Sequence, residues 1–296
     1  MLLDPRTLAA IGDLELVSRR VVDGTIAGLH RSPFHGYSAE FSQYRHYRQG
    51  DDLRYVDWKL FARTDRLYTK QFRETTNLAM QIAVDASASM DYAGAAGVTK
   101  FQYARLTAAA IAHLVSRQGD AVGLVTYAEG VRRYLPSRGG PAHLRAVLLT
   151  LAREAAGGAT HAAVALARAI DLLPRRGIFV VISDFYDEDA DVDRALTRAV
   201  HIGHEVILIQ VLTRDEVELP FRGDLEIEDP ETHARVLSNG GVAAQGYREA
   251  IAAFLERWRS RAAGHGMEYV RVLTDTPLDG ALRGYLRRRA VGSAGA

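Results

Sequence analysis

The sequence predicts an α/β fold in which helices cover both faces of a mostly parallel β-sheet. Short, strongly apolar segments at 78–84, 178–183 and 206–212 have the length and composition of buried strands. Segments with apolar residues at helical spacing alternate with them, which is typical of a parallel sheet. The chain has 296 residues, 48% of them hydrophobic and 25% charged, the balance of a globular protein of about two domains.

The first 77 residues differ from the rest and are expected to form a small helix and β-rich module. Residues 6–30 carry apolar side chains at helical spacing, which predicts one amphipathic helix. Residues 31–77 are rich in Tyr, Phe, Arg and Asp. Within them we predict short strands at Leu53–Trp58 and Arg66–Phe72.

Residues 78–296 are expected to form the α/β domain. After the strand Leu78–Val84, the pattern predicts a helix at Lys100–Arg117 and a hairpin made of Ala121–Tyr127 and Val131–Leu135. Further helices are predicted at Ala142–Glu154, Ala162–Leu173, Val192–Ile202, Ala243–Gly264 and Leu278–Arg289. Further strands are predicted at Ile178–Ser183, Val206–Leu212 and Tyr269–Leu273.

An acidic insertion, at about residues 213–246, interrupts this alternation. It carries eight acidic residues against three basic ones. Apolar residues alternate with polar ones in it, which predicts half-buried strands; they are Val217, Leu219, Leu225 and Ile227.

Composition excludes several kinds of site. The chain has no cysteine, so it has no disulfide, no thiol nucleophile, no iron–sulfur cluster and no Cys-ligated zinc. The longest stretch without a charged side chain, Ala155–Ala167, is shorter than the about 20 residues that span a bilayer. The first residues also lack the basic start of a signal peptide. We therefore expect a cytoplasmic protein without a membrane span.

Charge argues against nucleic-acid binding. The 37 Lys and Arg residues nearly balance 36 Asp and Glu, for a net charge of +1. The stretch 44–73 is rich in Arg and Tyr, which can stack on bases and contact phosphates, so single-stranded nucleic acid is an alternative ligand. Acidic residues are interleaved with its arginines, and we favour ion pairs within a small module; the acids are Asp51, Asp52, Asp57 and Asp65.

Oxygen-bearing side chains gather where predicted strands and loops end. Asp85, Ser87 and Ser89 follow the first buried strand, and Asp184 follows the strand 178–183. Thr160 lies in a glycine-containing loop before a helix. Ligands of open α/β sheets bind at the carboxyl ends of the strands, and oxygen ligands suit Mg²⁺, with Mn²⁺ or Ca²⁺ as alternatives. Helix capping by the three hydroxyl residues stays open as an alternative role.

This pattern resembles the metal-ion-dependent adhesion site of von Willebrand factor A domains. Asp85-x-Ser87-x-Ser89, then Thr160, then Asp184 come in the order and the structural places found in that family. The resemblance implies that the five residues hold a metal ion to which a partner protein offers a carboxylate. Two positions depart from the family: Phe185 stands where many adhesion domains have glycine, and His161 follows the loop threonine.

The N-terminal module is similar to the signature of bacterial domain-of-unknown-function family 58, in which such a segment precedes a von Willebrand factor A-like domain. The matching motifs are Glu40-Phe41, Arg45-x-Tyr47, Gly50-Asp51-Asp52-x-Arg54, Val56-Asp57-Trp58 and Ala62-Arg63. Members accompany MoxR-type AAA+ ATPases, so the resemblance implies an adaptor or co-chaperone that acts with such an ATPase on other protein complexes.

The sequence thus predicts a metal-dependent protein-binding module rather than an enzyme. Signatures of serine hydrolases, zinc proteases and phosphate-binding loops are missing. A Mg²⁺-dependent phosphohydrolase with Asp85 as nucleophile is the alternative. Phosphotransferases of the haloacid dehalogenase type carry a second Asp two residues later, and this chain has Ser87 there.

Overall fold

A six-stranded sheet forms the centre of the protein in the computed structural model, which describes residues 4–10, 12–28, 39–47, 56–74, 78–173, 176–187 and 190–278. The strand order is β10-β7-β6-β3-β4-β5. In chain order the strands are β3 (Ala79–Asp85), β4 (Ala121–Tyr127), β5 (Val131–Arg138), β6 (Ile178–Ser183), β7 (Glu205–Leu212) and β10 (Glu268–Leu273). All neighbours pair in parallel except β5, which runs antiparallel to β4 at one edge. The predicted fold class is confirmed.

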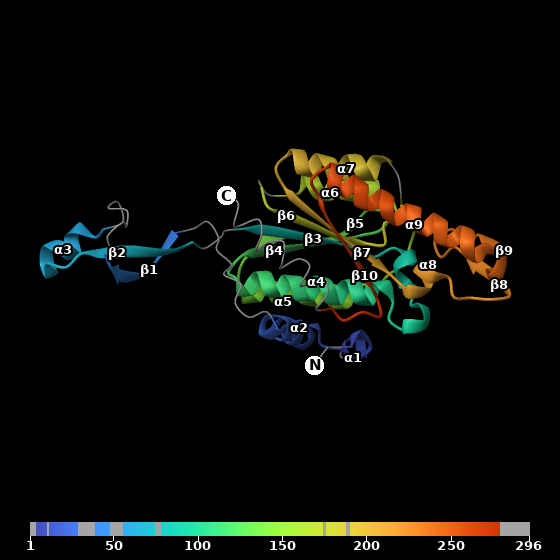
Figure 1. Ribbon diagram of the computed structural model, residues 1–296, viewed down its shortest axis with the longest axis horizontal. Coiled ribbons are helices and arrows are strands. Elements are labelled where there is room, and N and C mark those ends of the chain that lie inside the picture. Colours follow the sequence, from blue (N-terminus) through green and yellow to red (C-terminus); the bar gives the residue numbers. More distant parts are fainter. Residues whose placement is uncertain are drawn as a thin grey trace.

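Helices cover both faces of this sheet, as predicted (Figure 1). On one face lie α4 (Lys100–Arg117) and α5 (Pro141–Arg153), with the N-terminal helices packed outside them. On the other face lie α6 (Ala162–Asp171), α7 (Ala190–His201) and α9 (Gly240–Gly264). Each face has its own apolar core, because the central strands bury side chains on both sides.

The N-terminal segment forms two helices rather than the single helix predicted for residues 6–30. They are α1 (Pro5–Ala10) and α2 (Leu14–Gly28). Asp13 starts the second helix, since its Oδ1 accepts hydrogen bonds from the backbone N–H groups of Glu15 (2.9 Å) and Leu16 (3.2 Å). Residues 29 and 30 of the prediction lie outside the described ranges.

A hairpin made of β1 (Ala39–His46) and β2 (Tyr68–Glu74) extends from one end of the molecule (Figure 1). The strand predicted at Arg66–Phe72 is confirmed from Tyr68, where β2 begins, and β2 continues to Glu74. The strand predicted at Leu53–Trp58 is wrong at its C-terminal end: Val56 forms one isolated bridge, and Trp58 begins the helix α3 (Trp58–Thr64). Asp57 caps that helix, because its side chain accepts the N–H groups of Lys59 and Leu60. Residues 53–55 are not described.

The acidic insertion contains a short helix and a hairpin, at the opposite end of the molecule from β1 and β2 (Figure 1). Its elements are α8 (Arg214–Glu218), β8 (Asp224–Glu228) and β9 (Arg235–Asn239). The prediction of half-buried strands was right for Leu225; Ile227 lies in the strand but is exposed, and Val217 and Leu219 do not lie in strands. Thr213 and Glu216 form a capping box there, which favours a helix over a strand.

The C-terminal elements agree with the predictions as far as they are described. Helix α9 begins at Gly240, a few residues before the predicted start, and β10 pairs in parallel with β7. The helix predicted at Leu278–Arg289 lies outside the described ranges from residue 279 onward. None of the helices described is long and apolar enough to cross a membrane.

Candidate metal-binding site

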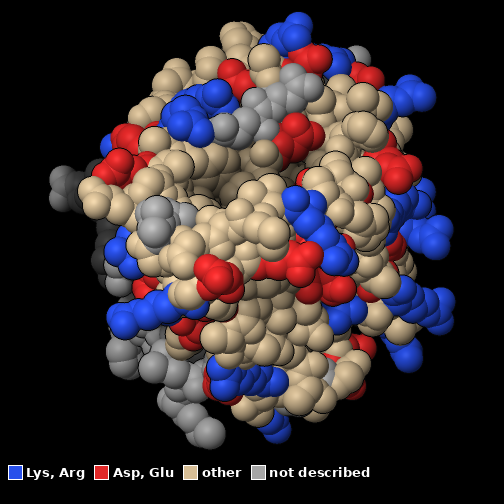
Figure 2. Space-filling view, turned by 90° about the vertical axis from the view of Figure 1, so that its right-hand side faces the viewer, with Lys and Arg blue, Asp and Glu red and all other residues tan. Residues whose placement is uncertain are grey.

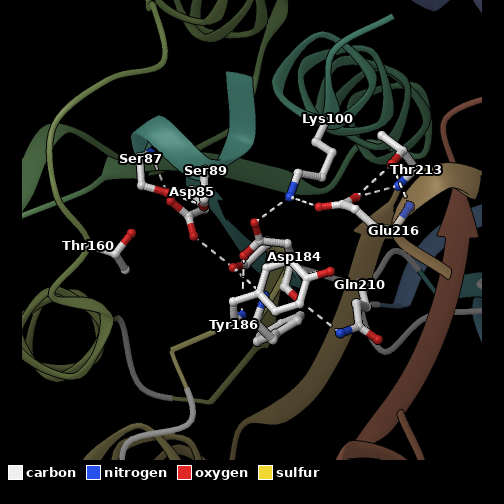
Figure 3. Close-up of polar contacts among 12 residues, drawn as sticks. Asp85, Ser87, Ser89, Lys100, Thr160, Asp184, Tyr186, Gln210, Thr213 and Glu216 are labelled. Atoms are coloured by element: carbon white, nitrogen blue, oxygen red, sulfur yellow. Dashed lines mark hydrogen bonds and ion pairs between the residues drawn. The ribbon is translucent and has the colours of Figure 1, made fainter. Parts of the chain in front are cut away.

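Two buried aspartates meet at the carboxyl edge of the sheet. Asp85 is the last residue of β3, and Asp184 directly follows β6. Because β3 and β6 pair in parallel, with Val84 opposite Ile182, both carboxylates emerge at the same edge (Figure 3). Their residues are only 1% and 2% exposed. The edge therefore carries two acidic groups that are almost excluded from water.

Local hydrogen bonds hold the Asp85 carboxylate. The backbone N–H of Ser87 donates to Oδ1 (2.9 Å), and the hydroxyl of Ser183 donates to Oδ2 (2.7 Å). Burial raises the pKa of Asp85 well above its usual range, and the nearby charge of Asp184 raises it further. Ser183 was not among the predicted site residues. Its place beside Asp184 was visible in the sequence, but its contact with Asp85 depends on the pairing of β3 with β6.

Ser87 and Ser89 lie next to Asp85 with their hydroxyl groups 3.1 Å apart. They belong to the turn that contains a 3-10 helix at Ala88–Asp91. Ser87 stands at the N-cap position of that helix, but its side chain accepts no capping hydrogen bond. The capping role considered for Ser87 is thus not seen. Its hydroxyl lies with that of Ser89 beside the carboxylate of Asp85 (Figure 3).

Thr160 borders the same cavity but bonds elsewhere. Backbone hydrogen bonds between its loop and the turn after Asp85 bring the two segments together: Gly157 N–H donates to Ala86 O (2.9 Å), and Ala88 N–H to Gly158 O (2.9 Å). The N-cap of the following helix is His161, not Thr160. The N–H and the hydroxyl of Thr160 donate to the carboxylate of Glu231 in the acidic insertion, at 2.8 and 2.7 Å.

Asp184 is tied to a buried lysine. The Nζ atom of Lys100, at the start of α4, donates to Asp184 Oδ2 (2.7 Å) and to Glu216 Oε1 (2.6 Å). Burial lowers the pKa of Lys100, but the charges of Asp184 and Glu216 outweigh this effect and the pKa rises above its ordinary value. Lys100 and Glu216 were not among the predicted site residues, because they stand 84 and 32 positions from Asp184 with no motif to connect them.

The backbone after Asp184 is held from two other elements. Gln210 of β7 donates its side-chain N–H to the carbonyl of Asp184 (2.8 Å), and the indole N–H of Trp258 in α9 donates to the carbonyl of Phe185 (3.1 Å). Phe185 has a φ of 58°, a conformation that favours glycine. The departure from the adhesion-domain glycine is accommodated because the Phe185 ring is buried against Trp258, with the ring centroids 4.9 Å apart.

A cavity of about 1110 Å³ lies between the sheet edge and the acidic insertion. Figure 2 shows this end of the molecule, where the surface is hollowed and acidic side chains are prominent. The cavity wall includes Asp85, Ser89, Thr160 and Asp184. Further acidic residues of the wall are Asp91, Asp187, Asp215, Glu216, Glu226, Glu228, Asp229 and Glu231.

The donor chemistry fits a hard cation. Two carboxylates and two neighbouring hydroxyls come together at one edge, and all are oxygen ligands of the kind that Mg²⁺ accepts alongside water. Among the residues described, no three or more His, Asp or Glu side chains form a metal-holding group by themselves. The hydroxyl groups and water would therefore have to complete the coordination.

Comparison with known proteins places the chain in a family. The model of a family described as "Protein of unknown function DUF58" matches residues 43–260. An uncharacterized protein of Mycobacterium tuberculosis is 36% identical over 235 residues, which cover 77% of this chain and 72% of the relative. An uncharacterized protein of Mycobacterium bovis matches equally well, with 36% identity over 235 residues and the same coverage of 77% and 72%.

Two solved structures are among those similar to this chain. The hypothetical protein BatB of Bacteroides thetaiotaomicron is 16% identical with a TM-score of 0.46, over 72% of this chain and 98% of that one. A von Willebrand factor type A protein of Catenulispora acidiphila is 21% identical with a TM-score of 0.36, over 62% and 44%. The family match covers most of the chain, including every residue of the candidate site. The chain belongs to the DUF58 family, as its motifs predicted, and has the mostly parallel α/β sheet that the sequence predicted.

Proposed function

We propose that the chain is a non-enzymatic protein-binding module whose binding depends on a divalent cation. The ion would be held by Asp85, Ser87, Ser89 and Asp184, with Thr160 at the rim. Mg²⁺ is the first candidate, and Mn²⁺ or Ca²⁺ are the alternatives. When bound, such an ion supplies a positive charge to which a carboxylate of a partner protein can bind.

One observation carries this proposal: the two aspartates are buried at one edge, next to two hydroxyls and a large cavity. Like charges excluded from water are unfavourable, and a cation would relieve this. Lys100 offsets the charge of Asp184. Among the described residues, its ion pairs are with Asp184 and Glu216 and not with Asp85. Support for a cation therefore rests most strongly on Asp85.

The resemblance of the N-terminal motifs to the family supports one choice of partner. We propose that the protein acts in the cytoplasm as an adaptor or co-chaperone with a MoxR-type AAA+ ATPase, in the remodelling or maturation of protein complexes. Size-exclusion chromatography of the purified chain with a MoxR-type ATPase of the same genome tests this pairing. Co-elution that is lost in Asp85→Ala would support it, and separate elution with ATP and Mg²⁺ present would contradict it.

The metal can be tested by following the thermal midpoint during a Mg²⁺ titration. A ligand at a hundred times its dissociation constant stabilises a native protein by about 2.7 kcal/mol. We expect the wild type and Asp91→Asn to respond, and Asp85→Ala and Asp85→Asn not to respond. Asp91 is a matched control because it lines the same cavity and is exposed, outside the proposed ligand set. An equal response of wild type and Asp85→Ala would refute the metal site.

The phosphohydrolase alternative has one structural point in its favour, the pair of buried carboxylates at a strand edge. Against it, no second aspartate stands two residues after Asp85, where this chain has Ser87. Hydrolysis of p-nitrophenyl phosphate distinguishes the two functions. Sustained Mg²⁺-dependent turnover that Asp85→Asn abolishes would replace the binding proposal with the enzymatic one.

A further inference from the structure

Thr160 already holds a carboxylate, and that carboxylate belongs to the same chain. Its backbone N–H donates to Oε2 of Glu231 and its hydroxyl donates to Oε1, at 2.8 and 2.7 Å. Both hydrogen-bond donors of one residue thus bind both oxygens of one acid, 71 positions further along the chain. Among the residues described, Glu231 forms no ion pair with a Lys or Arg, so this contact is its main anchor.

The turn that carries Glu231 is well ordered by its own hydrogen bonds. Asp229 accepts the N–H of Glu231 (2.9 Å) and the hydroxyl of Thr232 (2.6 Å). The backbone N–H of His233 also donates to the carbonyl of Asp229 (2.8 Å). The turn therefore presents the Glu231 side chain in a fixed direction, toward the loop of Thr160.

The rest of this hairpin is largely exposed. In β8 and β9 every residue is exposed except Leu225 and Ser238, which are half-buried. With little apolar burial of its own, an isolated hairpin of two strands is marginally stable in water. The Glu231–Thr160 contact is therefore a major link between the tip of the hairpin and the domain.

We propose that the Thr160 loop is a carboxylate-binding site and that Glu231 is its internal occupant, which holds the 224–239 hairpin closed over the cavity. This rests on the proposed function, because the ligand class is the same acidic side chain that a partner would offer there. A partner with an exposed Glu or Asp must then displace Glu231. The hairpin excludes weaker competitors, since a tethered ligand acts at an effective concentration on the order of 1 mM.

Hydrogen–deuterium exchange in EDTA tests the closure of the hairpin by the Glu231–Thr160 contact without any metal. In Glu231→Ala, the amide of Thr160 loses its acceptor, and we expect it to exchange at least tenfold faster than in the wild type. The amides of 224–239 should exchange faster as well. Glu226→Ala is the matched control, because Glu226 lies on the same hairpin but pairs with Arg235, and the amide of Thr160 should be unaffected there. Unchanged exchange at Thr160 in Glu231→Ala overturns the proposed closure by Glu231, whatever the Mg²⁺ titration shows.

A labelled peptide of residues 224–239 tests the carboxylate site. Fluorescence anisotropy in Mg²⁺ should show at least tenfold tighter binding to Glu231→Ala than to the wild type, whose own hairpin occupies the site. A peptide with Gln in place of Glu231 should bind Glu231→Ala at least tenfold more weakly. Equal affinity of both proteins, equal affinity of both peptides, or no binding to either protein would overturn the proposal.

Discussion

The Nζ atom of Lys100 lies 2.7 Å from Oδ2 of Asp184, and both side chains are almost fully buried, at 1% and 3% exposure. The same ammonium group lies 2.6 Å from Glu216, whose side chain is 14% exposed. Lys100 thereby joins the end of β6 to the start of the acidic insertion. A buried charge that loses its partner is strongly destabilising, so this cluster should be sensitive to substitution.

The first prediction concerns this cluster. Lys100→Met leaves two carboxylates without their cation and should reduce the free energy of unfolding by about 3–5 kcal/mol, measured in urea. Adding Glu216→Gln should recover part of the loss, because one orphaned charge is removed. Arg198→Met is the control: it breaks an exposed ion pair with Asp171 and should cost at most about 1 kcal/mol. A loss within 1 kcal/mol of this control would show that the cluster is not important for stability.

The second prediction concerns Ser183 as a positioning residue for Asp85. Its hydroxyl donates to Asp85 Oδ2 and accepts the N–H of Phe185 (2.9 Å). Ser183→Ala removes both contacts. We expect the apparent dissociation constant for Mg²⁺, measured from the thermal midpoint, to rise at least tenfold. Ser183→Thr keeps a hydroxyl and should restore most of the response.

Ser137→Ala controls for the loss of a serine elsewhere in the sheet. The Ser137 hydroxyl bonds Met80 O and Gln81 Oε1, near the other end of β3. This variant should change stability without changing the Mg²⁺ response. If Ser183→Ala responds to Mg²⁺ as the wild type does, Ser183 has only a structural role.

The third prediction concerns Gly123 in β4. A Cβ atom there would lie 2.2 Å from Oε1 of Gln81 and 2.7 Å from the carbonyl of Leu135. The space is taken by the buried Gln81 amide, which donates to Leu135 O (3.1 Å). Gly123→Ala should therefore destabilise the protein by about 1–3 kcal/mol in urea. Gly130→Ala meets no atom within 4 Å and should change stability by less than about 0.5 kcal/mol.

The fourth prediction concerns pH and the packing of α2 on α4. Burial lowers the pKa of His113, the charges of Arg117 and Arg19 lower it further, and the acids Asp23 and Glu15 act in the opposite direction. The Nδ1 atom of His113 lies 3.4 Å from the hydroxyl of Ser18 on α2. Because the pKa is lower in the folded state than the unfolded value of 6.5, the unfolded state takes up the proton first.

Stability contributed by neutral His113 is therefore full above pH of about 6.5 and falls as the pH drops through the folded pKa. The free energy of unfolding in urea should decrease between pH 7.5 and pH 5, and the decrease should be smaller in His113→Gln. Burial lowers the pKa of His204 in the same direction, so part of the pH dependence remains in that variant. An unchanged pH dependence in His113→Gln would contradict the assignment.

Local sequence signals predicted most of the α/β domain. The strands at 178–183 and 206–212 are apolar throughout, since both faces of a central parallel strand are buried, and helical spacing identified α4 through α7. Predictions failed where capping overrode apolar spacing. Asp13 divides the N-terminal helix, Asp57 starts a helix at Trp58, and the Thr213 capping box replaces an expected strand.

For the candidate site, the sequence by itself identified Asp85, Ser87, Ser89, Thr160 and Asp184, because strand ends in a parallel sheet share one edge. The tertiary structure decided what these side chains bind. Lys100 pairs with Asp184, Ser183 bonds Asp85, and Glu231 binds Thr160. Such partners are 71 to 98 positions apart, and only the packing of separate elements brings their polar atoms within hydrogen-bonding distance. The spacing of apolar residues predicts which face of each segment is buried. It does not predict which side chain of another segment will contact that face.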